Sequence, residues 1–244
     1  MYIRRIGLLA AVLVIGTTIL VGGDPMDNKT SQEGIRKSQP SDAQTPKEIE
    51  TATFALGCFW GPDGRFGILP GVIRTRVGYA GGTSDRPTYY HIDGHAETIQ
   101  VDFDPSVISY GELLEVFWKS HDPFGSPYSS QYRSMIFFHN EAQQRLAEAS
   151  LEEQVARPLT EVVSCEQFTR AEDYHQKYRL QNELILSGEL RARFEKFDAF
   201  VDSTAVARVN GYLAGWGSPG QLEEEIASFG LSKRAEEILR QHVK

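Results

Sequence analysis

Between residues 51 and 181 the apolar positions of the chain switch repeatedly between two spacings. Short continuous or alternating apolar runs predict five strands, at 52–56, 71–79, 98–103, 134–138 and 159–163. Spacing of three and four residues predicts helices after residue 61 and at 109–119, 140–157 and 171–181. Since strands and helices alternate, we predict an α+β fold: a two-layer α/β sandwich with a mixed sheet and a ferredoxin-like core.

Outside this region the pattern changes. Residues 24–50 are rich in Ser, Gln, Asp, Lys and Pro, which is typical of a flexible linker. Residues 182–244 are helical in pattern, with an interruption at the glycine-rich segment 210–217. We therefore predict one folded domain over residues 51–181, followed by a helical C-terminal extension.

The first 23 residues have the order of an export signal. A basic start with Arg4 and Arg5 precedes the apolar run 6–21, and small residues follow at 22–23. The run is also close to the length of a membrane span, so an uncleaved membrane anchor is the alternative. Either interpretation predicts that the protein is exported, to the periplasm or outside the cell, or anchored to the membrane.

Composition excludes several classes of protein. The formal net charge of −8 argues against nucleic-acid binding, which needs a basic face. With only two cysteines, Cys58 and Cys165, the chain is not built on a disulfide framework. No Cys/His spacing is typical of a metal site.

Cys58 is the strongest candidate for chemistry. It stands in Gly57-Cys58-Phe59-Trp60-Gly61, where a predicted strand ends and a helix begins. Unpaired N–H groups at a helix start favour a thiolate, and Phe59 and Trp60 would form an aromatic wall beside it. Such a site suits a substrate with an electrophilic sulfur and a methyl group. The alternative is a buried structural cysteine.

Three further side chains could complete such a site. Glu97, at the start of a predicted strand, would act as a proton donor if an apolar pocket kept it protonated. Tyr89 and Tyr132 offer hydroxyls that bind an oxygen without adding charge. Ordinary surface or core roles remain open for all three. A Cys–His pair with His95, His121 or His175 is conceivable, although each histidine fits a structural role better.

Six short motifs follow one another between residues 57 and 176. They are GCFWG at 57–61, GYAGG at 78–82, PTY at 87–89, GHAE at 94–97, QYRS at 131–134 and AEDYHQ at 171–176. In order and spacing they resemble the A-type peptide methionine sulfoxide reductases, over about residues 51–181. The helical ending resembles a single-cysteine branch of that family.

The resemblance implies an oxidoreductase that reduces methionine S-sulfoxide, free or in oxidised proteins. Cys58 would attack the sulfur, Glu97 would donate a proton, and Tyr89 and Tyr132 would hold the sulfoxide oxygen while the aromatic pair receives the methyl group. The resulting sulfenic acid would be reduced by an external thiol: a thioredoxin-like protein, glutathione or dithiothreitol. We also expect a monomer that holds no bound cofactor or metal.

The chain departs from the family pattern in four places. Asp63 replaces a common Glu, the loop between Tyr89 and Gly94 is shorter, and Pro127 replaces an active-site Asp. The tail with resolving cysteines is absent, so Cys165 is the only possible internal resolver, and we expect direct reduction by external thiols instead. The competing hypotheses are a redox sensor or sulfoxide-binding module with little turnover, and a Cys–His hydrolase or transferase.

Overall fold

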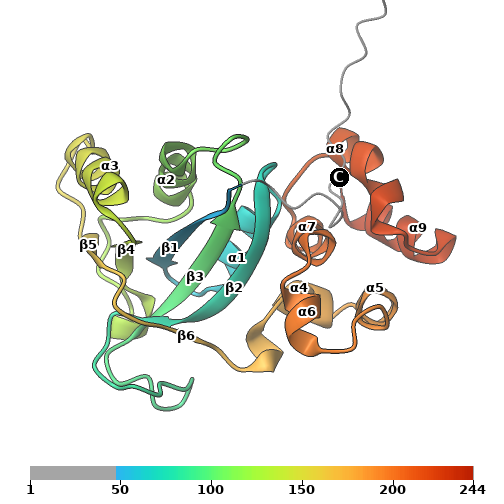
Figure 1. Cartoon of the computed structure of the whole chain (residues 1–244), viewed down its shortest axis with the longest axis horizontal. Helices are drawn as coiled ribbons and strands as arrows, with labels where there is room; N and C mark the ends of the chain where they lie inside the picture. Colours follow the sequence, from blue (N-terminus) through green and yellow to red (C-terminus); the bar gives the residue numbers. More distant parts are fainter. Residues whose placement is uncertain (1–47, 244) are drawn as a thin grey trace, which may run out of the picture. The chain divides into compact units, whose positions relative to one another are not determined.

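The computed structural model describes residues 48–243, and its centre is a six-stranded mixed sheet in the order β5-β4-β1-β3-β2-β6 (Figure 1). The strands are β1 (Glu50–Leu56), β2 (Val72–Ala80), β3 (Ala96–Phe103), β4 (Ser134–Phe138), β5 (Glu161–Ser164) and β6 (Phe168–Arg170). All neighbouring pairs are antiparallel except β4 and β5. The order β4-β1-β3-β2 is the ferredoxin-like arrangement, which confirms the predicted α+β class.

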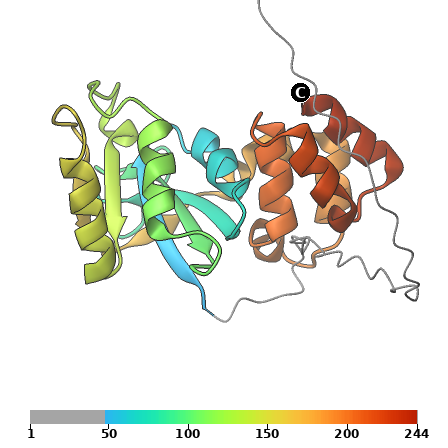
Figure 2. The ribbon, with the colours of Figure 1, turned by 90° about the horizontal axis from the view of Figure 1, so that it is seen from above.

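Helices and short 3₁₀ turns connect and cover these strands. They are α1 (Trp60–Gly67), α2 (Tyr110–Lys119), η1 (Ser130–Tyr132), α3 (Glu141–Glu152), η2 (Asp173–His175), α4 (Tyr178–Gln181), α5 (Leu184–Arg191), α6 (Phe197–Val201), α7 (Thr204–Leu213), α8 (Pro219–Glu225), η3 (Ile226–Phe229) and α9 (Lys233–His242). Helices α4 to α9 gather on the β2 side of the sheet (Figures 1 and 2). From Tyr178 to His242 the described chain thus contains helices and no strand.

The main core lies between the sheet and the helices α1 and α2. Phe54 of β1 stacks on Phe66 of α1, with ring centroids 5.4 Å apart, and packs at the same distance against Phe117 of α2. All three rings are buried. The capping box predicted at the start of α2 is present, because Ser109 and Glu112 bond each other's backbone N–H. Phe54 therefore ties both helices to the strand that leads to Cys58.

The helix predicted over 171–181 is broken into η2 and α4. Lys177, between them, has a left-handed backbone with φ 51°. Its side chain is fully buried, and its ammonium donates to Asp63 Oδ1 at 2.7 Å while its N–H donates to Oδ2 at 3.0 Å. The buried ion pair between α1 and this junction outweighs the local preference for a continuous helix, which sequence periodicity could not reveal.

The predicted interruption at 210–217 is also wrong in its first half, because α7 continues to Leu213. Gly211 belongs to the helix because it faces α1 at close range: a Cβ there would lie 2.9 Å from the carbonyl oxygen of Gly64. A Cβ on Gly64 would in turn lie 2.4 Å from the Cβ of Ala214. The glycine marks a close helix crossing rather than a helix end.

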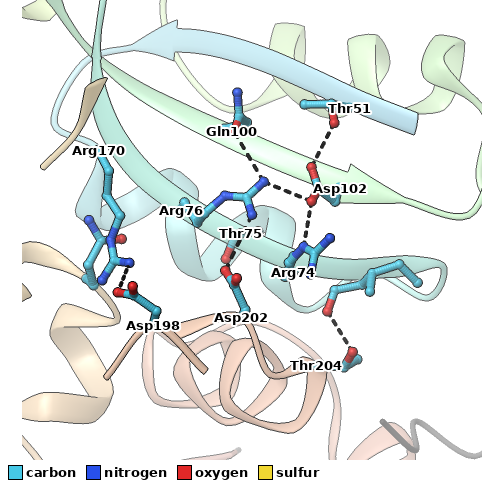
Figure 3. A network of polar contacts seen from close by, with 12 residues as sticks. Thr51, Arg74, Thr75, Arg76, Gln100, Asp102, Arg170, Asp198, Asp202 and Thr204 are labelled. Carbon is cyan, nitrogen blue, oxygen red and sulfur yellow. Dashed lines mark hydrogen bonds and ion pairs between the residues drawn. The ribbon is translucent and has the colours of Figure 1, made fainter. Parts of the chain in front are cut away.

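Polar contacts fasten the helical extension to the sheet (Figure 3). Asp102 of β3 accepts from Arg74 and Arg76 of β2 at 2.6 and 2.8 Å. Arg76 also reaches Asp202, 3.4 Å away between α6 and α7, and Thr204 Oγ1 donates to a β2 carbonyl at 2.6 Å. The extension thus packs against β2 here and against α1 at the Gly64–Gly211 crossing, and α1 is the helix that follows the Cys58 turn.

Replacing Gly64 by Ala is expected to destabilise the protein by about 1–3 kcal/mol, because the new methyl group overlaps Ala214 in the α1–α7 contact. Gly188, in α5, is the matched control, because nothing lies within 4 Å of the position that a Cβ would take there. At Gly188 the same change should add up to about 1 kcal/mol of helix stability. Urea unfolding of both variants measures the difference, and equal effects would contradict the close packing.

The predicted signal or anchor at 1–23, and nearly all of the linker at 24–50, lie outside the described residues. Across residues 48–243, the structure contains no helix that is both long and apolar enough to span a membrane.

Candidate active site

Cys58 lies in the turn that joins β1 to α1. Gly57, immediately before it, has φ +91°, a conformation that strongly favours glycine. The turn leaves Cys58 exposed to solvent, whereas Leu56 and Phe59 on either side of this Gly-Cys pair are buried. Helix α1 begins at Trp60, and the backbone N–H of Trp60 lies near the Cys58 sulfur and lowers the pKa of its thiol. The structure therefore presents the sulfur at the predicted junction of strand and helix.

Glu97 lies across from this turn, at the start of β3, and its residue is only 2% exposed. The backbone N–H of Phe59 donates to Oε2 at 2.9 Å, and Gln131 Nε2 donates to Oε1 at 2.5 Å. The Cys58 thiol lies beside the same carboxyl. Burial raises the pKa of Glu97, although the Phe59 N–H, Gln131 and Cys58 oppose it. A carboxyl next to the sulfur thus keeps its proton to a higher pH than an exposed glutamate does.

The electrostatics of Cys58 differ from the expectation. Partial burial is the largest cause that raises the pKa of the thiol, and the charge and hydrogen bond of Glu97 raise it further. The Trp60 N–H and the positive charge of Arg179 lower it, but not enough to reverse the direction. The helix start does favour the thiolate, but desolvation outweighs it. Burial therefore favours the protonated form of both Cys58 and Glu97 before substrate binds.

Replacing Glu97 by Gln should lower the apparent pKa of Cys58, because the change removes the negative charge and hydrogen bond that raise it. In the parent protein we expect the rate of iodoacetamide alkylation to rise with a midpoint above the usual thiol value of about 8.5. The measurement uses Cys165→Ser as background, so that one thiol reacts. A midpoint that stays or increases in Glu97→Gln would contradict the coupling.

The side chains of Tyr89 and Tyr132 lie near each other, and Tyr132 also lies near Glu97 and Cys58. Both are half-buried. Desolvation, together with the charge of Glu97, raises the pKa of Tyr132 to about 12, so its hydroxyl stays neutral. The structure therefore brings both predicted hydroxyls to the Cys58–Glu97 pair, where a neutral donor can bind an oxygen.

The predicted aromatic wall consists of Trp60, while Phe59 lies behind it. Phe59 is 1% exposed, and its ring centroid is 5.1 Å from that of His175. Trp60 remains partly accessible, stacks on Tyr178 at 3.7 Å with an interplanar angle of 6°, and donates its indole N–H to His175 Nδ1 at 3.2 Å. Burial lowers the pKa of His175, which keeps it a neutral acceptor. Trp60 is thus held rigidly.

Sequence reasoning missed two supporting residues, Gln131 and Tyr178. Each lies in or beside one of the six motifs: Gln131 opens QYRS, and Tyr178 follows AEDYHQ by two positions.

The alternative of a catalytic Cys–His pair finds no support in the contacts of Cys58, because no hydrogen bond joins Cys58 to a histidine within residues 48–243. The same part of the chain holds no group of three His, Cys, Asp or Glu side chains that could bind a metal ion.

Cys165 lies away from Cys58. Its thiol lies beside the side chain of Thr53. Thr53 is three strand positions before the end of β1, so about 10 Å of strand separates it from Leu56, and Cys58 lies two residues further on. A disulfide needs Cα atoms less than about 7 Å apart. Both cysteines are free thiols, and the structure does not bring them together.

Comparisons with known proteins agree with this geometry. The family model described as peptide methionine sulfoxide reductase matches residues 50–203. A peptide methionine sulfoxide reductase of Drosophila melanogaster is 41% identical over 222 residues, covering 88% of each chain. MsrA of Methanococcoides burtonii is 50% identical over 146 residues, covering 53% of this chain and 95% of the relative. The structure resembles methionine sulfoxide reductase A of Corynebacterium diphtheriae, with a TM-score of 0.52, 28% identity, and coverage of 60% and 82%.

Proposed function

The chain belongs to the peptide methionine sulfoxide reductase family and is a thiol-dependent reductase of methionine sulfoxide. We propose that Cys58 and Glu97 carry out its chemistry. The observation that supports this assignment is their juxtaposition: a buried carboxyl, fixed by the Phe59 N–H at 2.9 Å, has a raised pKa and lies beside an accessible thiol. A nucleophile and a proton donor in direct contact are what sulfoxide reduction requires.

The first step transfers an oxygen atom. As the Cys58 sulfur attacks the sulfoxide sulfur, Glu97 protonates the sulfoxide oxygen, while Tyr89 and Tyr132 hydrogen-bond that oxygen. Bond rearrangement then moves the oxygen to Cys58 and releases methionine. Overall, a thiol and a sulfoxide become a sulfenic acid and a thioether, so the cysteine loses the two electrons that the substrate gains.

The aromatic wall determines how the substrate lies. The exposed part of Trp60 offers an apolar surface for the methyl group, and Tyr178 and His175 prevent the indole from turning away. Phe59 contributes from beneath, through its contacts with Tyr79 and His175 rather than by meeting the substrate. A fixed wall on one side makes the two sulfoxide epimers unequal at the sulfur, which supports selection of one of them, and the family likeness implies that this is the S epimer.

The second step restores the thiol. We assign it to two external thiols, which reduce the sulfenic acid to Cys58 and water and leave as a disulfide. Cys165, held against Thr53, is poorly placed to act as an internal resolver. A thioredoxin-like protein or glutathione fits this role because Cys58 is exposed. We propose that the protein acts as a monomer. Its substrates are oxidised proteins, which it repairs, or free methionine sulfoxide.

We infer the cellular location from the first 23 residues alone. Their basic start, apolar run and small residues support export, with the enzyme either released or anchored to the membrane.

A steady-state assay with separated epimers of acetyl-methionine sulfoxide and dithiothreitol tests the function. We expect methionine product from the S epimer only, with repeated turnovers per enzyme. Oxidation of Cys58 by peroxide without release of product from either epimer would instead favour the redox-sensor hypothesis.

A further inference from the structure

We propose that a groove beside the catalytic turn binds a lysine or arginine side chain next to the methionine sulfoxide in a protein substrate. This inference rests on the proposed function and extends it, because the groove makes the enzyme prefer oxidised methionines that have a basic neighbour in sequence.

The groove, called here the Asp122 groove, has a volume of about 430 Å³. It lies between the segment 121–134 and the start of β5, and its wall includes Asp122, Pro127, Leu159 and Glu161. Gly57 and Tyr132 complete one end of it. It is therefore distinct from the Trp60 wall.

Continuity with the reaction site identifies the occupant. Gly57 is bonded directly to Cys58, and Tyr132 lines the groove while also lying near Glu97 and Cys58 in the site. On the Trp60 side, Tyr178 stacks on the indole and occupies the space behind it. A polypeptide with its sulfoxide at Cys58 can therefore place a neighbouring residue in the groove, whereas free methionine sulfoxide has no such residue.

The charges of the groove select the kind of residue. Arg133 is its cation, but all three guanidinium nitrogens already donate: Nε to Ser130 O, Nη1 to Glu161 and Nη2 to Gly94 O. Asp122 is exposed and accepts the N–H of Phe124, and within residues 48–243 no ion pair engages it. Burial lowers the pKa of His121, so this histidine adds no positive charge at neutral pH. The groove thus offers an uncompensated carboxylate.

Apolar surface in the groove suits the rest of a basic side chain. Leu159 is 54% exposed although its backbone N–H is fixed to Pro123 O at 2.8 Å, and Pro127 adds a second apolar surface. The methylene stem of lysine or arginine can cover such surface while its charged end reaches the Asp122 carboxylate. Glutamate would meet repulsion there. Alanine would leave the apolar surface uncovered.

The test uses peptides of the form acetyl-X-Met(O)-X-amide with lysine, alanine or glutamate at both X positions, and acetyl-methionine sulfoxide amide as the substrate without neighbours. At low salt, we expect kcat/KM to be about fivefold higher for the lysine peptide than for the glutamate peptide, as for an exposed charge pair. Added salt should reduce this ratio toward one.

Two variants localise the effect. Asp122→Asn keeps an oxygen to accept the Phe124 N–H, and it should reduce the lysine-to-glutamate ratio toward one. Glu237→Gln removes an equal charge from α9, on the far side of the molecule from β5 (Figures 1 and 2), and should leave the ratio unchanged. Equal kcat/KM for all peptides, or a preference that survives in Asp122→Asn, overturns the groove assignment. Failure to reduce any substrate, acetyl-methionine sulfoxide amide included, overturns the proposed function instead.

Discussion

Replacing Cys58 by Ser is expected to abolish the reduction of methionine sulfoxide. A serine hydroxyl keeps the size of the side chain, but it is a far weaker nucleophile and cannot accept the oxygen as a sulfenic acid. Chromatographic assay of methionine from the S epimer with dithiothreitol should show no product above the rate without enzyme. The fold should persist, because Cys58 is exposed and contributes nothing to the core.

Cys165→Ser is the matched control for this experiment. Cys165 lies against Thr53 and away from the reaction site, so the variant should keep most of the parent rate with dithiothreitol. Loss of activity in Cys165→Ser, or retention of activity in Cys58→Ser, would contradict the assignment of the oxygen transfer to Cys58.

Replacing Glu97 by Gln is expected to lower kcat/KM for the S epimer by about a hundredfold or more, because an amide cannot donate the proton that the leaving oxygen needs. While Glu97 stays protonated the deficit should grow with pH, since solvent protons that substitute for the acid become scarcer. Above the raised pKa of Glu97 the parent loses its acid as well, so the deficit should shrink there. The measurement is a pH profile of kcat/KM for parent and variant.

A second variant separates the acid from its surroundings. Gln131→Leu removes one donor to Glu97 but keeps the carboxyl, so it should reduce the rate less than Glu97→Gln does. Thermal unfolding of both variants checks the fold. A Glu97→Gln enzyme within threefold of the parent rate at every pH would exclude the carboxyl from proton transfer.

The sheet and the site could be predicted from the sequence largely because their signals are local. Alternation in residues 98–103 and the apolar run before Cys58 depend on which side chains face the core, and the structure has both strands. The capping box at Ser109 and Glu112 is equally local. The contacts of Glu97 followed from motif order rather than from pattern.

Other features depend on partners distant in sequence. The break at Lys177 follows from its ion pair with Asp63, 114 residues away, and the continuation of α7 through Gly211 follows from a crossing with α1. Neither is visible in a window of neighbouring residues. The raised pKa of Cys58 has the same origin, because a helix start is a local signal whereas burial against Glu97 is not.

A single turnover without reductant tests the central claim most directly. Racemic acetyl-methionine sulfoxide is mixed with the reduced enzyme, and the product and the intact protein are analysed by chromatography and mass spectrometry. The account predicts one molecule of acetyl-methionine per molecule of enzyme, formed from the S epimer. One oxygen is added to Cys58, and Cys165 is still a free thiol. Product formed while Cys58 remains unmodified would contradict the account.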